Sequence, residues 1–238
     1  MVRIALITVN INRLFLTGFL FETMKVTRQY SALDRLIIDF DGFLRQAKPA
    51  KSPVNRPDPA DSVAEMPMDT LMRTLSASLM RVNHAGEVSA QALYQGQGLT
   101  ARNPQVRQIM KTAALEESDH LVWCQQRLQD LHSHTSYLNP FWYVGSFSFG
   151  LIAGLMGDHW SLGFVAETEH QVVRHLDTHL VRLPENDQKS RAILQQMRID
   201  ESHHATVAVE SGARELPEPV KHMMRFCSSV MTTIASRI

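Results

Sequence analysis

Two short stretches of the chain decide its fold: "ALEESDHL", from Ala114 to Leu121, and "IDESHHAT", from Ile199 to Thr206. Each contains a glutamate followed three residues later by a histidine, Glu117 with His120 and Glu201 with His204. Residues three apart lie on one face of a helix, so each pair can present a carboxylate and an imidazole to the same point. The same spacing recurs in "AETEH", with Glu167 and His170, so the surroundings of each pair must decide its role.

The neighbours on each helical face distinguish buried carboxylates from solvated ones. Glu117 shares its face with an apolar stripe made of Val106, Met110, Ala113, Ala114, Leu121, Cys124 and Leu128. Glu201 shares its face with Leu194, Met197, Ala205 and Ala208. Glutamate is almost never fully buried unless it is paired or bound to a metal. Both pairs are therefore interpreted as metal ligands.

The third copy gives a different result, because its Glu167 does not lie on the apolar face of the helix. Glu169 lies about 200° around the helix from Glu167. It shares its face with the cleanest apolar stripe of this segment, which comprises Leu162, Val165, Ala166, Val172, Val173, Leu176 and Leu180. We therefore expect Glu169 to point inward, and Glu167 with His170 to lie at the rim or in solvent.

A fourth carboxylate, Glu87 in "RVNHAGE", is selected by spacing. Glu87 and Glu117 are 30 residues apart (117 − 87), and Glu169 and Glu201 are 32 apart (201 − 169). An antiparallel hairpin returns to the same height after such a separation, so all four carboxylates fall in one layer of a four-helix bundle. One Glu from each of two helices and Glu-x-x-His from each of the other two is the ferritin-like di-iron arrangement. The predicted metal ligands are Glu87, Glu117, His120, Glu169, Glu201 and His204.

The chemistry of this set favours two iron or manganese ions. Four carboxylates balance the charge of two divalent cations, and zinc sites are richer in cysteine and histidine. His175 and His84 are candidates for partners that orient a ligand, with surface histidines as the alternative. The same alternatives stay open for His203 and Asp200.

The rest of the chain predicts an all-α fold, because no segment shows the alternation typical of a strand. Long helical patterns cover Asp69–Gly96, Pro104–His134, Ser161–Leu183 and Asp187–Ala213, and a further helix covers Pro217–Ile238. Asn139–Gly157 has no charged residue and contains Gly150 and Gly154, whose spacing permits close helix contact. Its length is near the lower limit for a membrane span. It is expected to be a membrane-associated helix half-sunk in one leaflet, with a buried connecting helix as the alternative.

The N-terminal part is expected to be separate from the catalytic domain. We predict an extension with a short helix, Tyr30–Gln46, and a Pro-rich linker, Ala47–Ser62, over residues 1–66, and a ferritin-like domain over 67–238. Residues 1–24 contain arginines and no acid before Glu22, which leaves a mitochondrial presequence open. The interpretation favoured here is that Met24 is the start and the preceding residues are non-native.

Composition excludes few classes of protein but disfavours nucleic-acid binding. The chain has 238 residues, is 44% hydrophobic and 20% charged, and has a formal net charge of zero. Its two cysteines form no C-x-x-C pair and fit a reducing compartment. Eleven histidines are many for this length, which agrees weakly with metal binding.

Four segments carry a resemblance to a known family: "LMRVNHAGEVSAQALYQGQ", "EESDHL", "GFVAETEHQVVRHLDTHL" and "MRIDESHHA". The chain resembles the demethoxyubiquinone hydroxylase family of ubiquinone biosynthesis, its bacterial branch in particular, from about Tyr30 to the C-terminus. By that resemblance the same six residues are the iron ligands. It implies two Fe ions per chain and O2-dependent hydroxylation of the ring of 2-polyprenyl-3-methyl-6-methoxy-1,4-benzoquinol.

The resemblance also implies a reductant and a cellular place. NADH or the reduced quinone would supply electrons, although the chain has no dinucleotide fingerprint. Peripheral binding to the cytoplasmic face of the bacterial inner membrane is expected, with the matrix side of the mitochondrial inner membrane as the alternative. Other ubiquinone-biosynthesis proteins and a second copy of the chain stay open as partners. The competing functions are a ferritin-like iron store or oxidase and a non-catalytic helical binding protein.

Overall fold

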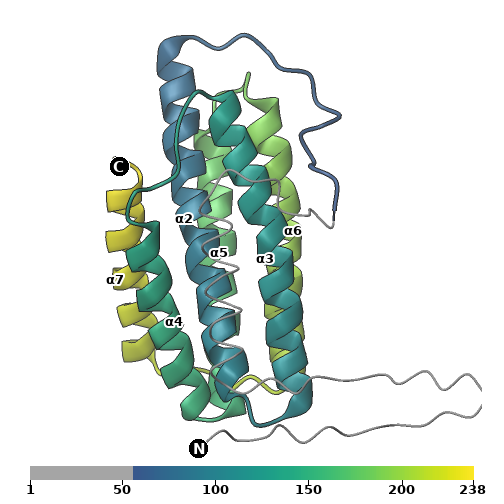
Figure 1. Cartoon of the computed structure of the whole chain (residues 1–238), viewed down its shortest axis with the longest axis vertical. Helices are drawn as coiled ribbons and strands as arrows, with labels where there is room; N and C mark the ends of the chain where they lie inside the picture. Colours follow the sequence, from purple (N-terminus) through teal and green to yellow (C-terminus); the bar gives the residue numbers. More distant parts are fainter. Residues whose placement is uncertain (1–55) are drawn as a thin grey trace, which may run out of the picture. The chain divides into compact units, whose positions relative to one another are not determined.

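Helices make up nearly all of the part of the chain that the structure, a computed structural model, describes, residues 56–238 (Figure 1). No strand occurs among these residues, so the all-α prediction is confirmed. The predicted helix Tyr30–Gln46 and residues 1–24 lie outside the described residues. The helices are α2 (Thr70–Thr100), α3 (Pro104–Asp130), α4 (Asn139–Leu155), α5 (Asp158–Arg182), α6 (Gln188–Glu210) and α7 (Glu218–Ala235).

Capping residues explain why several helices begin where they do. The Asp69 side chain accepts a hydrogen bond from the backbone N–H of Met72, and α2 starts directly after it. Asn103 caps α3 in the same way, and Pro104 occupies the first turn. The predicted start of α5 at Ser161 was three residues late. Gly157 has a φ of 112°, which lets the chain leave α4 sharply and enter α5 at Asp158.

Four of the helices form an antiparallel bundle. Short connections join α2 to α3 and α5 to α6, while α3 packs beside α6 and α2 beside α5. Between the two hairpins, α4 packs along α2 and runs parallel to it (Figure 1). Because α4 returns the chain to the end of the bundle where α3 began, α3 and α5 run in the same direction. Two apolar clusters fill the bundle. One includes Leu79, Trp123, Leu176 and Met197, and the other includes Leu93, Met110, Leu162 and Ala208.

The close contact between α4 and α2 depends on glycines. A Cβ atom at Gly150 would overlap the carbonyl oxygen of Leu93, and one at Gly154 would overlap Oγ1 of Thr100. Gly96 of α2 meets the backbone of α4 in the same way. The close helix contact predicted from the Gly150-x-x-x-Gly154 spacing is therefore present.

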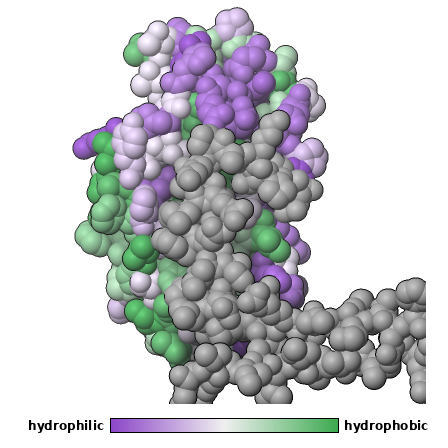
Figure 2. Space-filling view, viewed as in Figure 1, coloured by the Kyte–Doolittle hydropathy of each residue, from purple (hydrophilic) through white to green (hydrophobic). Residues whose placement is uncertain are grey.

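The outer face of α4 is apolar and exposed, so the helix is not a buried connection. Phe141, Ile152 and Leu155 are 71%, 56% and 64% exposed. On the neighbouring helix α7, Phe226 is 69% exposed. Figure 2 shows the apolar surface along the left edge of this view, where Figure 1 draws α4 and α7. Within residues 56–238 no helix combines the length and apolar character needed to cross a bilayer, and attachment to a membrane surface stays a prediction.

Residues 56–69, here called the strap, lie against α3 and α6 before α2 begins. Ala60 is buried in the core cluster that contains Trp123. Glu65 forms a salt bridge with Arg127 of α3, and the carbonyl of Pro67 accepts a hydrogen bond from Asn186. The predicted domain boundary between residues 66 and 67 falls within this packed segment, and the division itself stays a prediction.

Candidate metal centre

The structure brings the six predicted ligands together from four helices. Glu87 comes from α2, Glu117 and His120 from α3, Glu169 from α5, and Glu201 and His204 from α6. All six are buried, with exposed fractions between 0% and 7%. Their candidate ligand atoms form two groups, each within 4.8 Å: Glu87, Glu117, His120 and Glu201, and Glu117, Glu169, Glu201 and His204. The two groups share Glu117 and Glu201, and each could hold a metal ion, while the ligand roles themselves stay a prediction.

The two glutamates of the "AETEH" segment, Glu167 and Glu169, occupy different environments. Glu169 is fully buried in the cluster. Glu167 lies at the rim of α5, where its carboxylate accepts a hydrogen bond from Gln171 at 2.7 Å and lies near Arg174 and Arg225. His170 is exposed. The helical face, rather than the Glu-x-x-His spacing, determines which glutamate reaches the interior.

Several carboxylate oxygens of the cluster lack hydrogen-bond partners within the described part of the chain. Both oxygens of Glu169 are buried in this way, as is Oε1 of Glu117. A buried acceptor without a partner is destabilising, and a buried charge more so. A divalent cation would satisfy these oxygens, and carboxylate with imidazole is a donor set that suits iron or manganese. The residues present therefore fit the implied metal.

Burial and mutual repulsion make bare negative charges unfavourable in the cluster, so its groups bind protons when no cation is present. Burial raises the pKa of Glu169 well above its usual value, and the neighbouring Glu201 adds to the effect. Burial and Glu117 raise the pKa of Glu87 likewise. Burial alone would lower the pKa of His204, but hydrogen bonds to Glu116 and Glu201 outweigh it and raise the pKa to about 11. Protons thus occupy the cluster without a cation, and metal binding would release them.

Each histidine of the cluster is backed by an acidic residue from the opposite helix. Nε2 of His120 lies 2.9 Å from Oδ2 of Asp200, and Nε2 of His204 lies 2.5 Å from Oε2 of Glu116. Sequence reasoning left Asp200 open and missed Glu116. The signal was present, because an acid directly precedes the glutamate in both "EESDH" and "DESHH". Such partners fix the orientation of a metal-binding imidazole.

Neither of the two candidate supporting histidines forms a hydrogen bond with the cluster among the described contacts. His84 is buried, and its Nδ1 lies 3.3 Å from the side-chain amide of Asn139. The ring of His175 packs against that of His179 at 3.9 Å, and its Nε2 is buried without a partner within residues 56–238. Burial lowers the pKa of both His84 and His175 to about 4. Their predicted role in orienting a ligand stays a prediction.

An apolar pocket of about 170 Å³ is lined by residues of α2, α4, α5 and α7, and Glu87 is the cluster residue among them. Its lining includes the buried Glu87 and the half-buried His175. Phe149, which is 41% exposed, and Met223, which is 46% exposed, belong to its outer lining. A mainly apolar molecule can therefore reach a carboxylate of the candidate metal centre from the apolar side of the protein.

The chain matches a family of quinone-biosynthesis proteins. The model of the family described as "Ubiquinone biosynthesis protein COQ7" matches residues 74–235, which includes all six residues of the cluster. The chain belongs to this family.

Curated relatives of the COQ7 family support the assignment over most of the chain. A "3-demethoxyubiquinol 3-hydroxylase" of Nitrosococcus oceani is 57% identical over 208 residues, which is 87% of this chain and 97% of the relative. Proteins of the same name from Polynucleobacter asymbioticus and Pseudomonas fluorescens are each 53% identical, over 87% and 90% of this chain and 100% of the relatives. The resemblance seen in the sequence, including its bacterial character, is confirmed.

Proposed function

We propose that the chain is a di-iron monooxygenase, a 3-demethoxyubiquinol 3-hydroxylase that installs a hydroxyl group on the ring of 2-polyprenyl-3-methyl-6-methoxy-1,4-benzoquinol. The observation that carries the proposal is the apolar pocket whose lining includes Glu87 of the buried cluster. The names of the curated relatives support the same reaction. Two Fe ions, O2, and electrons from NADH or the reduced quinone are its requirements.

The protein residues hold the metal, orient the substrate and exclude water. The four glutamates and two histidines would hold two irons, which supply the activation of O2 when bound. Asp200 and Glu116 keep Nδ1 of His120 and of His204 directed into the cluster. Each carboxylate does so by accepting a hydrogen bond from Nε2–H of its histidine. The walls of the pocket are mainly apolar, so they favour a quinol ring over water. Nε2 of His175, without a partner within residues 56–238, lines the same pocket and can hydrogen-bond a ring oxygen.

We infer that the protein binds the surface of the membrane that holds its substrate, the cytoplasmic face of the bacterial inner membrane. The exposed apolar residues of α4 and α7 support this inference, because Phe149 and Met223 belong both to that surface and to the pocket lining. A prenyl tail can then remain in an apolar environment while the ring enters the pocket. Binding to other enzymes of the pathway, and to a second copy of the chain, belongs to the same proposal.

A ferritin-like iron store or oxidase would use the same ligands. Such a protein needs a route for iron and no site for an organic molecule. The pocket at Glu87 is mainly apolar, and its outer end lies on an apolar surface. These features favour a hydrophobic organic substrate over iron mineral.

Quinone profiling of a bacterial strain that lacks its own hydroxylase tests the reaction. The strain should accumulate the methoxy-bearing precursor, and expression of this chain should restore ubiquinone. Continued accumulation with a soluble, iron-loaded chain present would refute the hydroxylase proposal. Iron analysis of the purified protein should give about two irons per chain, and a markedly lower content would refute the di-iron proposal.

Substitution of Gly86 tests the assignment of the pocket to the substrate. Gly86 lines the pocket, and a Cβ atom there would meet nothing within 4 Å. Gly86→Leu should therefore fold and bind iron, but it should fill the pocket and abolish restoration of ubiquinone. Gly145→Leu is the matched control, because a Cβ at this exposed position of α4 also meets nothing. Full activity of Gly86→Leu would exclude this pocket as the substrate site.

A further inference from the structure

Arg56 of the strap reaches the back of the candidate metal centre, on the side of α3 and α6. Its Nε lies 3.2 Å from Oδ2 of Asp119, and its Nη1 lies 2.9 Å from Oδ2 of Asp200. Its guanidinium also stacks over the ring of Trp123 at 4.9 Å. A guanidinium that engages two carboxylates and an aromatic face has little freedom of orientation. Arg56 therefore restrains Asp200 directly.

Arg56 can act on the metal centre through Asp200 and also directly, because its Nη2 lies 3.3 Å from Nε2 of His120. Oδ2 of Asp200 accepts from Arg56 and lies 2.9 Å from Nε2 of His120, while Gln196 donates to Oδ1 at 2.9 Å. Nδ1 of His120 faces the cluster, 3.1 Å from both Glu117 and Glu201. A proton on Nε2, donated to Asp200, leaves the lone pair of Nδ1 free for a metal. The position of Asp200 thus selects the nitrogen that His120 offers.

The other histidine of the cluster has a different environment. Nε2 of His204 faces Glu116, whose side chain is 36% exposed. Within residues 56–238, no arginine or lysine forms an ion pair with Glu116, whereas Arg56 pairs with Asp200. The sequence repeats the acid-Glu-x-x-His pattern on α3 and α6, but Arg56 of the strap forms an ion pair with the leading acid of only one copy.

We propose that Arg56 is a positioning residue that locks Asp200 against His120 and so strengthens metal binding at one of the two metal positions only. The inference rests on the proposed two-metal centre. The strap has further anchors in Ala60 and Glu65, so substitution of Arg56 should leave it in place. The two positions would then differ in affinity because of a residue that lies outside both Glu-x-x-His motifs.

Anaerobic titration of the full-chain apoprotein with ⁵⁷Fe(II) tests the proposal. The wild-type protein should bind two equivalents with distinguishable Mössbauer signals. Arg56→Gln should weaken one equivalent by about tenfold or more, the usual effect of losing a partner behind a metal-binding histidine. The other equivalent should keep its affinity and its signal. Arg56→Lys, which keeps the charge near Asp200, should recover part of the lost affinity.

Matched variants separate this role from a general effect of charge or stability. Arg198→Gln removes the same charge from α6, where Arg198 pairs with the exposed Asp177, and should change neither equivalent. Because Arg56 and Asp200 both contact His120, the effects of Arg56→Gln and Asp200→Asn should be less than additive. Equal weakening of both equivalents, no weakening, or additivity with Asp200→Asn would each overturn the proposal. Fewer than two equivalents in the wild-type protein would instead refute the two-metal centre.

Discussion

Glu169 has both carboxylate oxygens buried without a hydrogen-bond partner within the described residues. Burial raises its pKa well above the usual value, so a proton neutralises the carboxyl group when no cation does. A residue in such a position destabilises the metal-free protein and favours binding of a cation. Binding of a cation therefore explains why a carboxyl group is buried at this position, whereas packing of the core does not.

Glu169→Ala should weaken iron binding by more than about tenfold, since loss of a ligand exceeds loss of a supporting partner. It should also abolish hydroxylation, while the unfolding midpoint of the apoprotein stays equal or rises because an unpaired buried carboxyl is removed. Glu167→Ala is the control, because Glu167 contacts Gln171 and surface arginines at the rim. Iron content, quinone profiles and apoprotein melting curves provide the measurements. A variant of Glu167 that lost iron while Glu169→Ala kept it would reverse the assignment.

His179 links stability to pH at a position away from the proposed ligands. Burial lowers its pKa to about 3, with the neighbouring His175 and Arg182 adding to the effect, and its Nδ1 lies 2.8 Å from Oδ1 of Asn83. The unfolded state binds the proton at its ordinary pKa of about 6.5. Stability is therefore highest above that value and is lost as the pH falls toward the folded pKa.

Replacing His179 with Asn should reduce this pH dependence. Between about pH 6 and pH 4 the variant should take up about one proton fewer on unfolding than the wild-type protein, so its stability should fall less steeply. Denaturant unfolding curves at a series of pH values measure the slope. His222→Asn, on the exposed surface of α7, should leave the slope unchanged. Parallel slopes for His179→Asn and the wild type would contradict the assignment of a neutral buried imidazole.

At the scale of the elements, the contact between α2 and α4 should depend on glycine. A side chain at Gly150 would overlap backbone atoms of Leu93, which cannot move aside as the end of a side chain could. Gly150→Val should therefore lower the free energy of unfolding by about 1–3 kcal/mol or more, the usual range for overpacking. Gly145→Ala, on the same helix, meets nothing and should raise stability by about 0.5–1 kcal/mol. Chemical denaturation measures the free energy of unfolding of both variants. Equal values would show that the close contact between α4 and α2 does not contribute to stability.

The same elements show how far sequence reasoning reaches. Apolar stripes selected Glu169 over Glu167, and caps such as Asp69 located helix starts, because both signals are local to one helix. Local signals predicted a close contact at Gly150 and Gly154, but they could not say that α2 is the helix that packs there. They could not place Arg56 either, because its partners Asp119 and Asp200 are more than sixty residues away in the sequence. Contacts between elements depend on how the chain packs, and a single helical pattern does not contain that information.

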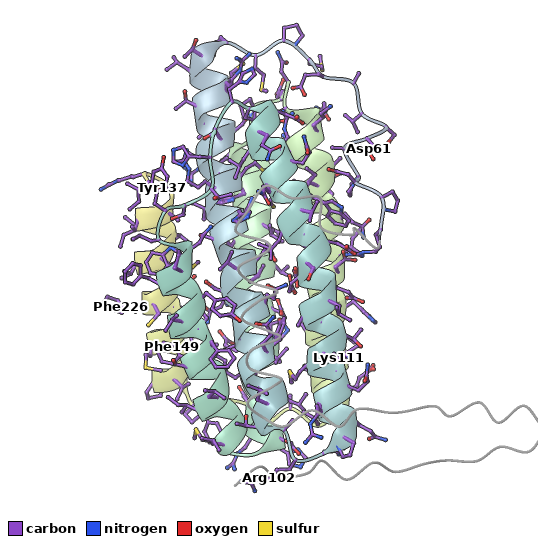
Figure 3. All side chains as sticks on the ribbon, viewed as in Figure 1. Asp61, Arg102, Lys111, Tyr137, Phe149 and Phe226 are labelled. Atoms are coloured by element: carbon purple, nitrogen blue, oxygen red, sulfur yellow. The ribbon has the colours of Figure 1, made fainter. Side chains whose placement is uncertain are left out.

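At the scale of the whole molecule, the apolar surface and the pocket lie together. Exposed aromatic and aliphatic residues of α4 and α7 gather on one side, and the labelled Phe226 and Tyr137 project outward there (Figure 3). The net charge of the chain is zero, so attraction to anionic lipid is not the expected driving force. Burial of apolar side chains would supply the free energy of membrane attachment.

Attachment to lipid vesicles should therefore depend on the apolar side chains of α4 and α7. Full burial of one large apolar side chain contributes about 1.5–3 kcal/mol, so each of Phe141→Ser, Ile152→Ser and Phe226→Ser should lower partitioning by about tenfold. Val181→Ser is the control, because Val181 is 86% exposed on α5 and belongs to neither helix. Vesicle co-sedimentation at low and high salt gives the measurement. Binding that persisted in the triple variant, or that vanished at high salt in the wild-type protein, would contradict attachment through these two helices.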